Sequence, residues 1–465
     1  MTPRKNIHFE ISERKILLRF MDAVCVIGAL YIVGASFEVN YFSVTTMHWS
    51  WSLVLSLYIT LTGTVFELYD LKASSDIFKT FRNIVITTSL TVLLYLFTPI
   101  VTPFLPEKRI EVLYFFVTIL SAILFWRSLY IGVIASPRFY KRVLVIGRGA
   151  NLKSIQETIA LSDPNYRIIG FINVDLGKEG TTGKYPDLDE YAPDELLKAV
   201  KNHQISEIIV AIYNQDNITN IIYEHLTILL NKGFTIREYT QVYEEMTNQI
   251  PVQYLGKDFY KYFPFGRSNQ NRLYMFFHRL MDVISATIGI CFGVLVLPLI
   301  LIGNILGNKG ALFYTQERVG KNGMSFKILK FRTMIKHAEK EGIQWAKKGD
   351  SRVTKFGRFL RNSRIDEIPQ FYNILKGEMS VIGPRPERPH FVEKLVKEVP
   401  FYDTRHAIKP GLSGWAQVNS RYGDSMEDSL EKLQYDLYYI KHRGVFLDIN
   451  ILIKTIGTVL FYRGQ

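Results

Sequence analysis

An adjacent pair of carboxylates, Asp366 and Glu367, is the strongest candidate for chemistry in this 465-residue chain. Pro369 is tolerated in the first turn of a helix and Gly377 is placed to end it, so the pattern predicts a helix running through Leu375. Both carboxylates would lie at its amino terminus, where free backbone amides stabilise anions and receive phosphate. One carboxylate could attack a diphosphate phosphorus while its neighbour holds Mg²⁺, which prefers oxygen ligands. Simple helix capping is the alternative interpretation of such a pair.

Basic residues surround this acidic pair in the sequence. Arg358, Arg361 and Arg364 precede it and Arg385 follows it. Arginine presents a planar fork of donors that suits phosphate oxygens. The two prolines that flank Arg385 stiffen its loop, so that its guanidinium is held at little conformational cost. These residues favour a phosphate-binding site, and the alternative for each of them is a solvated surface charge.

The net charge is concentrated in the C-terminal part of the chain. Residues 273–465 carry 29 lysines and arginines against 18 acidic residues, whereas residues 137–272 carry 16 of each. A basic surface suits anionic lipid headgroups, phosphate-bearing substrates or nucleic acid. The two cysteines, Cys25 and Cys291, lie in apolar runs, which excludes a disulfide framework or a zinc site and indicates a reducing compartment.

Four apolar runs near the N-terminus have about the length that a bilayer core requires. They are Ala23 to Gly34 with its flanks, Trp49 to Phe66, Ile84 to Ile100, and Val112 to Trp126. Basic residues precede the first run, separate the second from the third and follow the fourth, which predicts a cytoplasmic N-terminus and a cytoplasmic remainder after the fourth helix. No cleavable signal is expected. The alternative is four buried helices of a soluble protein.

An α/β domain is predicted after these helices. A strand from Arg142 to Gly147 leads into a helix from Leu152 to Leu161, and further strands follow at Arg167 to Asn173 and Glu207 to Ile212. Strands that alternate with helices indicate a parallel sheet. The third glycine of the dinucleotide fingerprint is absent, because Leu152 stands in its place, so we expect a scaffold or a regulatory nucleotide-binding domain.

A fifth apolar run, Met281 to Ile305, is long enough to span a membrane. Basic residues occur at both of its ends, which places both ends on the cytoplasmic side. Pro298 lies well inside the run, where its ring removes a helical hydrogen bond and can bend the chain back. We expect a re-entrant helix, broken at Pro298, within residues 279–305. An ordinary fifth span with a tolerated proline is the alternative.

Two further segments near the C-terminus have open interpretations. Trp415 is more often a packing or interfacial aromatic than a substrate contact, and we assign it to structure. The stretch from Gln434 to Ile440, followed by Lys441 and Arg443, could form an amphipathic helix on lipid headgroups or a buried core helix.

From Arg279 to its end, the chain resembles the polyprenyl-phosphate hexose-1-phosphate transferases, the larger members of the monotopic phosphoglycosyl transferases of bacteria. The matching motifs occur in the expected order: His278-Arg279-x-x-Asp282, Phe313-Tyr-x-Gln316-x-Arg318-x-Gly320, Lys330-Phe-Arg332-Thr-Met334, Arg361-x-x-Arg364-Ile-Asp366-Glu367-Ile-Pro369-Gln370, Gly383-Pro-Arg385-Pro386 and Lys409-Pro-Gly411-Leu-Ser-Gly414-Trp415-Ala-Gln417-Val418.

The resemblance implies that a sugar-1-phosphate passes from a UDP-sugar to undecaprenyl phosphate through a covalent intermediate on Asp366. It also implies Mg²⁺ as cofactor, with Asp366 and Glu367 as catalytic residues and Glu367 as the metal ligand. It implies that five basic residues line the phosphate site: Arg361, Arg364, Arg385, Lys330 and Arg332. It also places His278, Arg279 and Asp282 at the lipid headgroups. The chain departs from the family pattern at His278, where a lysine is common, and at Leu297, where a serine often precedes the proline.

The sequence therefore predicts four transmembrane helices over residues 1–136, a Rossmann-like domain over 137–255, a linker over 256–272 and a mainly α catalytic domain over 273–465. We expect a multi-pass protein of the bacterial inner membrane that contacts lipid, binds no nucleic acid and possesses cytoplasmic soluble domains. The transferred sugar, the ligand of the Rossmann-like domain and formation of a homo-oligomer stay open. The alternatives are a membrane-anchored nucleotide-sugar dehydratase or epimerase, and a non-catalytic scaffold of a polysaccharide assembly complex.

Overall fold

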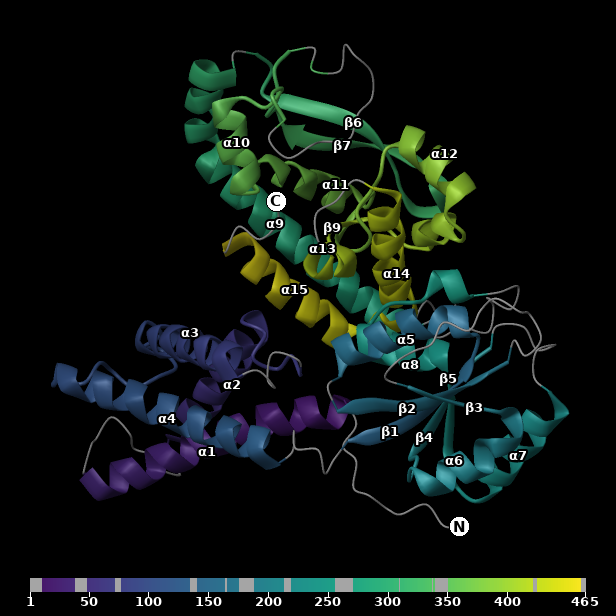
Figure 1. Cartoon of the computed structure of the whole chain (residues 1–465). Helices are drawn as coiled ribbons and strands as arrows, with labels where there is room; N and C mark the ends of the chain where they lie inside the picture. Colours follow the sequence, from purple (N-terminus) through teal and green to yellow (C-terminus); the bar gives the residue numbers. More distant parts are fainter. Residues whose placement is uncertain are drawn as a thin grey trace. The chain divides into compact units, whose positions relative to one another are not determined.

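A computed structural model of the chain describes residues 11–37, 48–71, 77–133, 140–163, 165–174, 188–212, 219–255, 271–308, 310–336, 338, 350–420 and 425–460. The chain divides into two compact units, Met1–Thr247 and Asn248–Gln465 (Figure 1). The first unit holds an N-terminal group of helices and an α/β domain, and the second unit carries the motifs that bear the candidate chemistry.

Four helices form at the four apolar runs near the N-terminus, as predicted. They are α1 (Ile11–Phe37), α2 (Trp49–Val65), α3 (Ile77–Leu96) and α4 (Arg109–Val133). In the part of the chain that the structure describes, three helical stretches are long and apolar enough to cross a membrane: Glu13–Phe37, Arg109–Val133 and Arg272–Asn308. Two of these stretches lie in α1 and α4, which indicates that this group of helices associates with a membrane. Helices α2 and α3 are not among the described stretches that are both long enough and apolar enough to cross a membrane.

The α/β domain contains a five-stranded parallel sheet in the order β3-β2-β1-β4-β5. The strands are β1 (Lys141–Gly147), β2 (Tyr166–Asn173), β3 (Asp189–Tyr191), β4 (Glu207–Ala211) and β5 (Thr235–Glu238). Helices α5 (Gly149–Ser162) and α8 (Tyr239–Thr247) cover one face, and α6 (Leu196–Asn202) and α7 (Asn220–Asn231) cover the other (Figure 1). This strand order confirms the predicted parallel sheet and is that of a Rossmann-type domain.

The second unit begins earlier than the predicted catalytic domain. Ile250, Val252 and Leu255 are buried in its hydrophobic core, and the amide of Ile250 donates to the carbonyl of Gln434. The prediction assigned these residues to the Rossmann-like domain. They pack in the second unit because their apolar side chains find a core there, a long-range contact that local sequence does not display.

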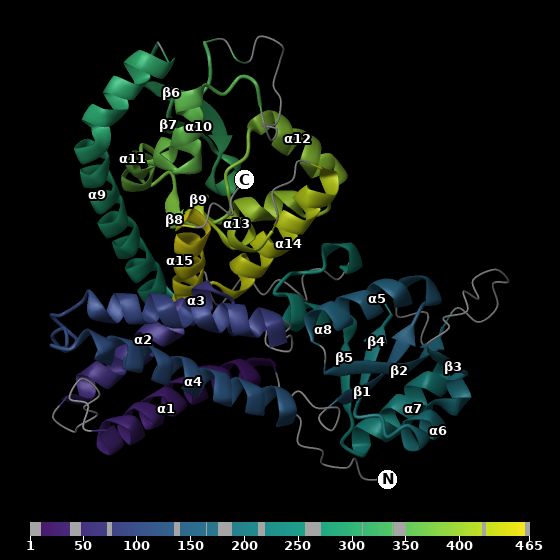
Figure 2. The same cartoon turned by 60° about the vertical axis from the view of Figure 1, so that its left-hand side comes forward.

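Helix α9 (Arg272–Gly303) is the longest element of the second unit. The predicted break at Pro298 is wrong, because α-helix continues through this residue and ends in a π-helical turn, Asn304–Asn308. Figure 2 shows α9 as one bowed helix along the edge of the unit. Its Gly289 and Gly293 let α11 (Gln370–Lys376) approach closely, since a Cβ at Gly289 would lie 2.3 Å from the ring of Phe371. After the proline, Gly303 and Gly307 receive Phe356 of α10 (Lys355–Asn362) in the same way, so close packing flanks Pro298 on both sides.

The remaining elements form a mainly α domain beside α9. A hairpin of β6 (Phe313–Val319) and β7 (Ser325–Phe331) is followed by α10 (Lys355–Asn362), α11, β8 (Ser380–Ile382), α12 (Pro389–Glu398), β9 (Gly411–Ser413), α13 (Trp415–Asn419), α14 (Met426–His442) and α15 (Val445–Leu460). The segment predicted as either interfacial or core is a core helix, because Leu433, Leu437 and Ile440 of α14 are buried. Trp415 is buried beside it, as predicted.

Candidate active site

The carboxylate pair lies at the start of the predicted helix. Asp366 and Glu367 occupy a 3₁₀ turn, Ile365–Glu367, which leads directly into α11. Gly377 ends α11 with a φ of 88°, a left-handed conformation that glycine adopts without a Cβ penalty. Arg364 enters the turn with a φ of 57°, which is uncommon for a residue other than glycine. The chain therefore turns sharply before the pair and presents both carboxylates at a helix amino terminus.

An asparagine bridge fixes the distance between α11 and the hairpin. The side-chain oxygen of Asn373 accepts the amide of Leu329 at 3.0 Å, and its nitrogen donates to the carbonyl of Lys327 at 2.8 Å. Asn373 is on α11, and both of its backbone partners are on β7. Lys330, the next residue of β7, is thereby held beside the carboxylate pair.

Glu367 is surrounded by cations from three separate segments. Its Oε1 accepts from Lys330 Nζ at 3.2 Å and from Arg385 Nη2 at 2.9 Å, and its Oε2 lies 3.7 Å from Arg364 Nη1. Burial alone would raise the pKa of Glu367, but the charges of Arg385, Lys330 and Arg364 outweigh it and lower that pKa. Glu367 is therefore an ionised carboxylate at any physiological pH.

Asp366 differs from its neighbour in its contacts. It is 7% exposed, and it forms no hydrogen bond or ion pair with any residue of the described ranges. Burial and the adjacent Glu367 charge raise its pKa, while Lys330, Arg361 and Arg364 act in the opposite direction. Its carboxylate oxygens are thus unengaged inside a positively charged site, which is the state that a nucleophile requires.

Arg361 and Arg332, two of the predicted phosphate-binding arginines, have different hydrogen-bond partners. Arg361 Nε donates to Thr333 Oγ1 at 2.9 Å, and its charge reaches Asp366. Arg332 instead donates to the carbonyl of Asn308 at 3.1 Å, at the end of the π-helical turn. Lys330, Arg361, Arg364 and Arg385 are therefore brought to the carboxylate pair, whereas the contact of Arg332 joins β7 to the end of α9.

The three predicted headgroup residues are on the first turns of α9. Arg279 is partly exposed and donates to the carbonyls of Ile374 and Leu375, which it caps at the end of α11. Asp282 is buried and accepts from the amide of Val381 at 2.8 Å. It therefore anchors β8 and is not open to a headgroup. His278 lies between Asp282 and Asp448, 3.8 Å from each carboxylate.

The donor set fits a magnesium ion that is shared with a substrate. In the described part of the chain, no group of three or more histidine, cysteine or acidic side chains is gathered. A cage made by the protein alone is thus not built there. Mg²⁺ commonly binds one or two carboxylates together with substrate phosphates and water, and the neighbouring carboxylates of Asp366 and Glu367 match that requirement.

The match to a known protein family lies within the second unit of the chain. Residues 273–462 match the family model described as bacterial sugar transferase. A protein of Bacillus subtilis (strain 168), provisionally named an undecaprenyl-phosphate N-acetylgalactosaminyl 1-phosphate transferase, is 48% identical over 144 residues, which are 79% of that protein and 30% of this chain. The chain belongs to the bacterial sugar transferase family.

Two longer relatives of this family extend the comparison. A UDP-N-acetylgalactosamine-undecaprenyl-phosphate N-acetylgalactosaminephosphotransferase of Aeromonas hydrophila is 41% identical over 223 residues, 47% of this chain and 51% of that protein. A UDP-glucose:undecaprenyl-phosphate glucose-1-phosphate transferase of Xanthomonas campestris pv. campestris is 34% identical over 279 residues, 58% of this chain and 56% of that protein. The matched region thus spans about half the length of these relatives.

The sequence did not predict two polar residues that fix the positions of the active-site side chains through hydrogen bonds. Asn373 ties α11 to β7, and Thr333 holds Arg361. Neither has a type or spacing that distinguishes it from an ordinary polar residue. Thr333 stands inside one of the family motifs between Arg332 and Met334, so that motif was the one available signal.

Proposed function

We propose that the chain transfers a sugar-1-phosphate from a UDP-sugar to undecaprenyl phosphate and releases UMP, the first step in building a surface polysaccharide. The observation that carries this proposal is the buried, unengaged carboxylate of Asp366 beside Glu367 and among Lys330, Arg361 and Arg385. The printed names of the relatives support the substrate classes, since each describes transfer to undecaprenyl phosphate. No feature of the described residues favours a dehydratase or a scaffold instead.

In the first step, an oxygen of Asp366 attacks the phosphorus that carries the sugar. The bond between this phosphorus and the oxygen bridging the two phosphates breaks, and UMP leaves with the bridging oxygen. A phosphosugar remains covalently bound to Asp366. Because Asp366 has no partner among the described residues, its attack breaks no existing hydrogen bond.

In the second step, a phosphate oxygen of undecaprenyl phosphate attacks the same phosphorus. The bond to Asp366 breaks, which regenerates the carboxylate and gives a lipid-linked diphosphosugar. Arg361 and Arg385 orient the phosphate oxygens, and Lys330 keeps a positive charge next to the reacting centre. A bound Mg²⁺ supplies further neutralisation of phosphate charge, with Glu367 as its ligand. Dividing the transfer into two steps lets a water-soluble donor and a lipid acceptor use one site in turn.

The membrane placement is part of the same proposal. The outer face of α9 exposes apolar side chains, among them Leu295 and Leu299, and the π-helical turn that follows exposes Leu306. Placing this face in lipid would bring the carboxylate pair to the bilayer surface, where the lipid phosphate lies. We propose that the bowed, unbroken α9 dips into the bacterial inner membrane from the cytoplasmic side with both of its ends facing the cytoplasm, and that α1–α4 cross the membrane, following the basic residues at their ends.

A release assay tests this function. Purified protein in lipid should release UMP from a UDP-sugar in the presence of Mg²⁺ and undecaprenyl phosphate, and a screen of radiolabelled UDP-sugars should identify the sugar. Asp366→Asn should lower turnover by roughly three orders of magnitude, as loss of a nucleophile commonly does. Glu367→Gln should chiefly weaken metal-dependent catalysis. A fully active Asp366→Asn enzyme would refute the assignment.

A further inference from the structure

The loop that carries Arg385 is held through its backbone. Four successive carbonyl groups, those of residues 384 to 387, each accept a hydrogen bond from another segment. The donors are Gly411 N to Pro384 O at 2.9 Å, Arg405 Nη2 to Arg385 O at 3.1 Å, Arg318 Nη1 to Pro386 O at 3.0 Å and Val319 N to Glu387 O at 2.9 Å. Two of these donors are arginine side chains, Arg405 from the 3₁₀ segment Tyr402–Ala407 and Arg318 from β6.

Arg405 is the more deeply buried of the two arginines. Its side chain is 6% exposed, and the same Nη2 that reaches the Arg385 carbonyl also donates to Asp436 Oδ2 at 2.7 Å. Its Nη1 donates to the hydroxyl of Tyr402. A planar guanidinium can serve all three partners at once, because its donors point in fixed directions. Asp436 and Tyr402 thus fix the orientation in which Arg405 meets the loop.

Arg318 holds the loop from the hairpin. It lies on β6, and its Nη2 donates to Gln316 Oε1 at 2.7 Å while its Nη1 reaches the Pro386 carbonyl. The carboxylate of Glu387 lies 3.5 Å from the same Nη1. The hairpin that places Lys330 beside Glu367 therefore also supports the loop that places Arg385 there.

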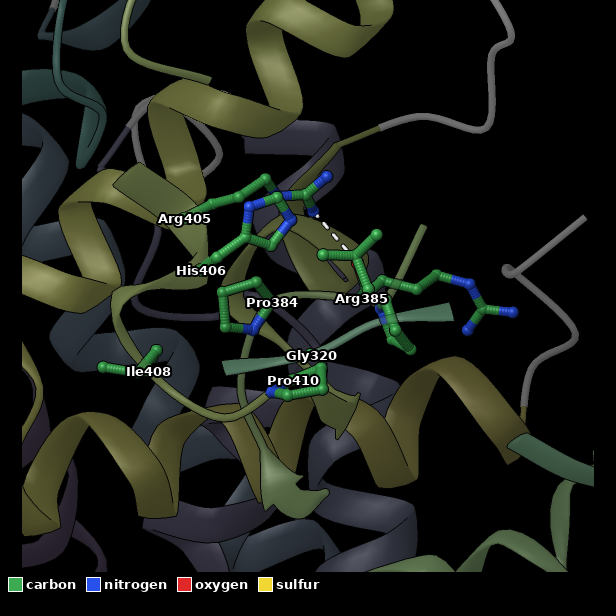
Figure 3. A pocket seen from close by; sticks show the side chains of 9 residues that line it. Gly320, Pro384, Arg385, Arg405, His406, Ile408 and Pro410 are labelled. Atoms are coloured by element: carbon green, nitrogen blue, oxygen red, sulfur yellow. Dashed lines mark hydrogen bonds between the residues drawn. The ribbon is translucent and has the colours of Figure 1, made fainter. Parts of the chain in front are cut away.

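The space beneath the loop is too small for a substrate group. Figure 3 shows the side chain of Arg385 extending away from Arg405 and His406, which line a small pocket together with the loop residues 384–386. That pocket measures about 10 Å³, which is about enough for one water molecule. This pocket therefore serves as support for the loop, and the guanidinium of Arg385 extends away from Arg405 to Glu367, where its Nη2 lies 2.9 Å from Glu367 Oε1.

We propose that Arg405 and Arg318 are positioning residues, which clamp the Arg385 loop by its carbonyl groups so that Arg385 meets Glu367 and the substrate phosphate. This inference rests on the proposed transfer activity. Neither residue touches the carboxylate pair, so each acts through Arg385. The two prolines of the loop limit its own motion, and the clamp sets its place relative to the pair.

Arg405→Lys tests the clamp with least damage to folding. Lysine keeps the positive charge beside Asp436, but a single ammonium cannot reproduce the fork that joins Asp436, Tyr402 and the loop. We expect turnover to fall at least tenfold with little change in unfolding temperature, and Arg318→Lys should act in the same direction. The matched control is Arg237→Lys, because Arg237 also pairs with a buried carboxylate and a tyrosine hydroxyl, those of Glu207 and Tyr166, but in the other unit. It should leave turnover within about twofold.

A double-mutant comparison separates positioning from general damage. In an Arg385→Ala background, Arg405→Lys should cost little further activity, because the residue through which it acts is already lost. If Arg405→Lys instead damaged the fold in general, it would lower activity by the same factor with and without Arg385. Full activity of both Arg405→Lys and Arg318→Lys, or equal losses with and without Arg385, would overturn the inference.

Hydrogen exchange gives a readout that does not depend on catalysis. The peptide covering residues 383–388 should exchange faster in Arg405→Lys than in the unmodified chain, and Arg237→Lys should leave it unchanged. Unaltered exchange in this peptide would count against the clamp. An inactive unmodified enzyme would refute the proposed function and leave this exchange result as the test of the clamp.

Discussion

Replacing Gly357 by alanine should disturb the active site through packing alone. Gly357 lies on α10, and a Cβ at this position would be 1.9 Å from the backbone carbonyl oxygen of Thr333. Ordinary van der Waals contact begins near 3.4 Å, so α10 and the Thr333 segment would have to separate by about 1.5 Å. The obstructing atom is backbone and cannot rotate away. Arg361 is on the same helix and donates to the Thr333 hydroxyl, so this separation moves Arg361 relative to Asp366.

The size of the effect follows from that displacement. Overpacking costs about 1–3 kcal/mol, which is offset by roughly 1 kcal/mol because alanine favours helix over glycine. We therefore expect a fall of a few degrees in unfolding temperature. A misplacement of this size near reacting groups costs on the order of 100-fold in rate, measured as UMP release.

Gly132→Ala provides the matched control for this substitution. Gly132 is also helical, and a Cβ there would have no atom of the described structure within 4 Å. This variant should keep its activity and stability. A Gly357→Ala enzyme with unchanged rate and unfolding temperature would show that α10 does not pack on Thr333 as described.

Three further predictions concern pH, domain limits and topology. Burial and the Arg405 charge lower the pKa of His406 to about 4, whereas the unfolded imidazole titrates near 6.5. The unfolded state binds more protons, so stability is lost as pH falls through this window, and His406→Gln should reduce the loss between pH 7 and pH 5 by about 2 kcal/mol in unfolding experiments. A fragment starting at Asn248 should fold and keep transferase activity, whereas one starting at Gln270 should be less stable because it lacks the buried side chains of residues 250–255. In a variant without the native cysteines, Lys321→Cys should react with an impermeant thiol reagent only after cells are permeabilised, and labelling of intact cells would place the catalytic domain outside.

Local rules predicted the elements that carry the site. The β1 strand follows from a continuous apolar run, the α5 helix from a helical pattern, and the parallel sheet from strands that alternate with helices. The turn chemistry of Pro369 and Gly377 predicted where α11 begins and ends. These features depend on a few neighbouring residues, which is why the sequence displays them.

Long-range packing determined the features that the sequence did not predict. Pro298 lowers the local preference for helix, but α9 continues through it between close contacts on both sides, at Gly289 and Gly293 before the proline and at Gly303 after it. Arg332 was grouped with the phosphate site by its position in a motif, and its direction depends on Asn308, 24 residues earlier. Arg405 reaches a carbonyl 20 residues away. No periodicity encodes such contacts, so they became visible only in three dimensions.

Mass spectrometry of a covalent intermediate tests the central claim most directly. The enzyme would be mixed with the UDP-sugar that it uses and Mg²⁺, but without lipid, then quenched and digested. Attack by Asp366 predicts one sugar-phosphate adduct on the peptide that contains Asp366, formed together with UMP and absent from Asp366→Asn. Later addition of undecaprenyl phosphate should remove the adduct and yield the lipid-linked diphosphosugar. An active enzyme that forms no adduct, or that releases UMP only when both substrates are bound together, would contradict the two-step account.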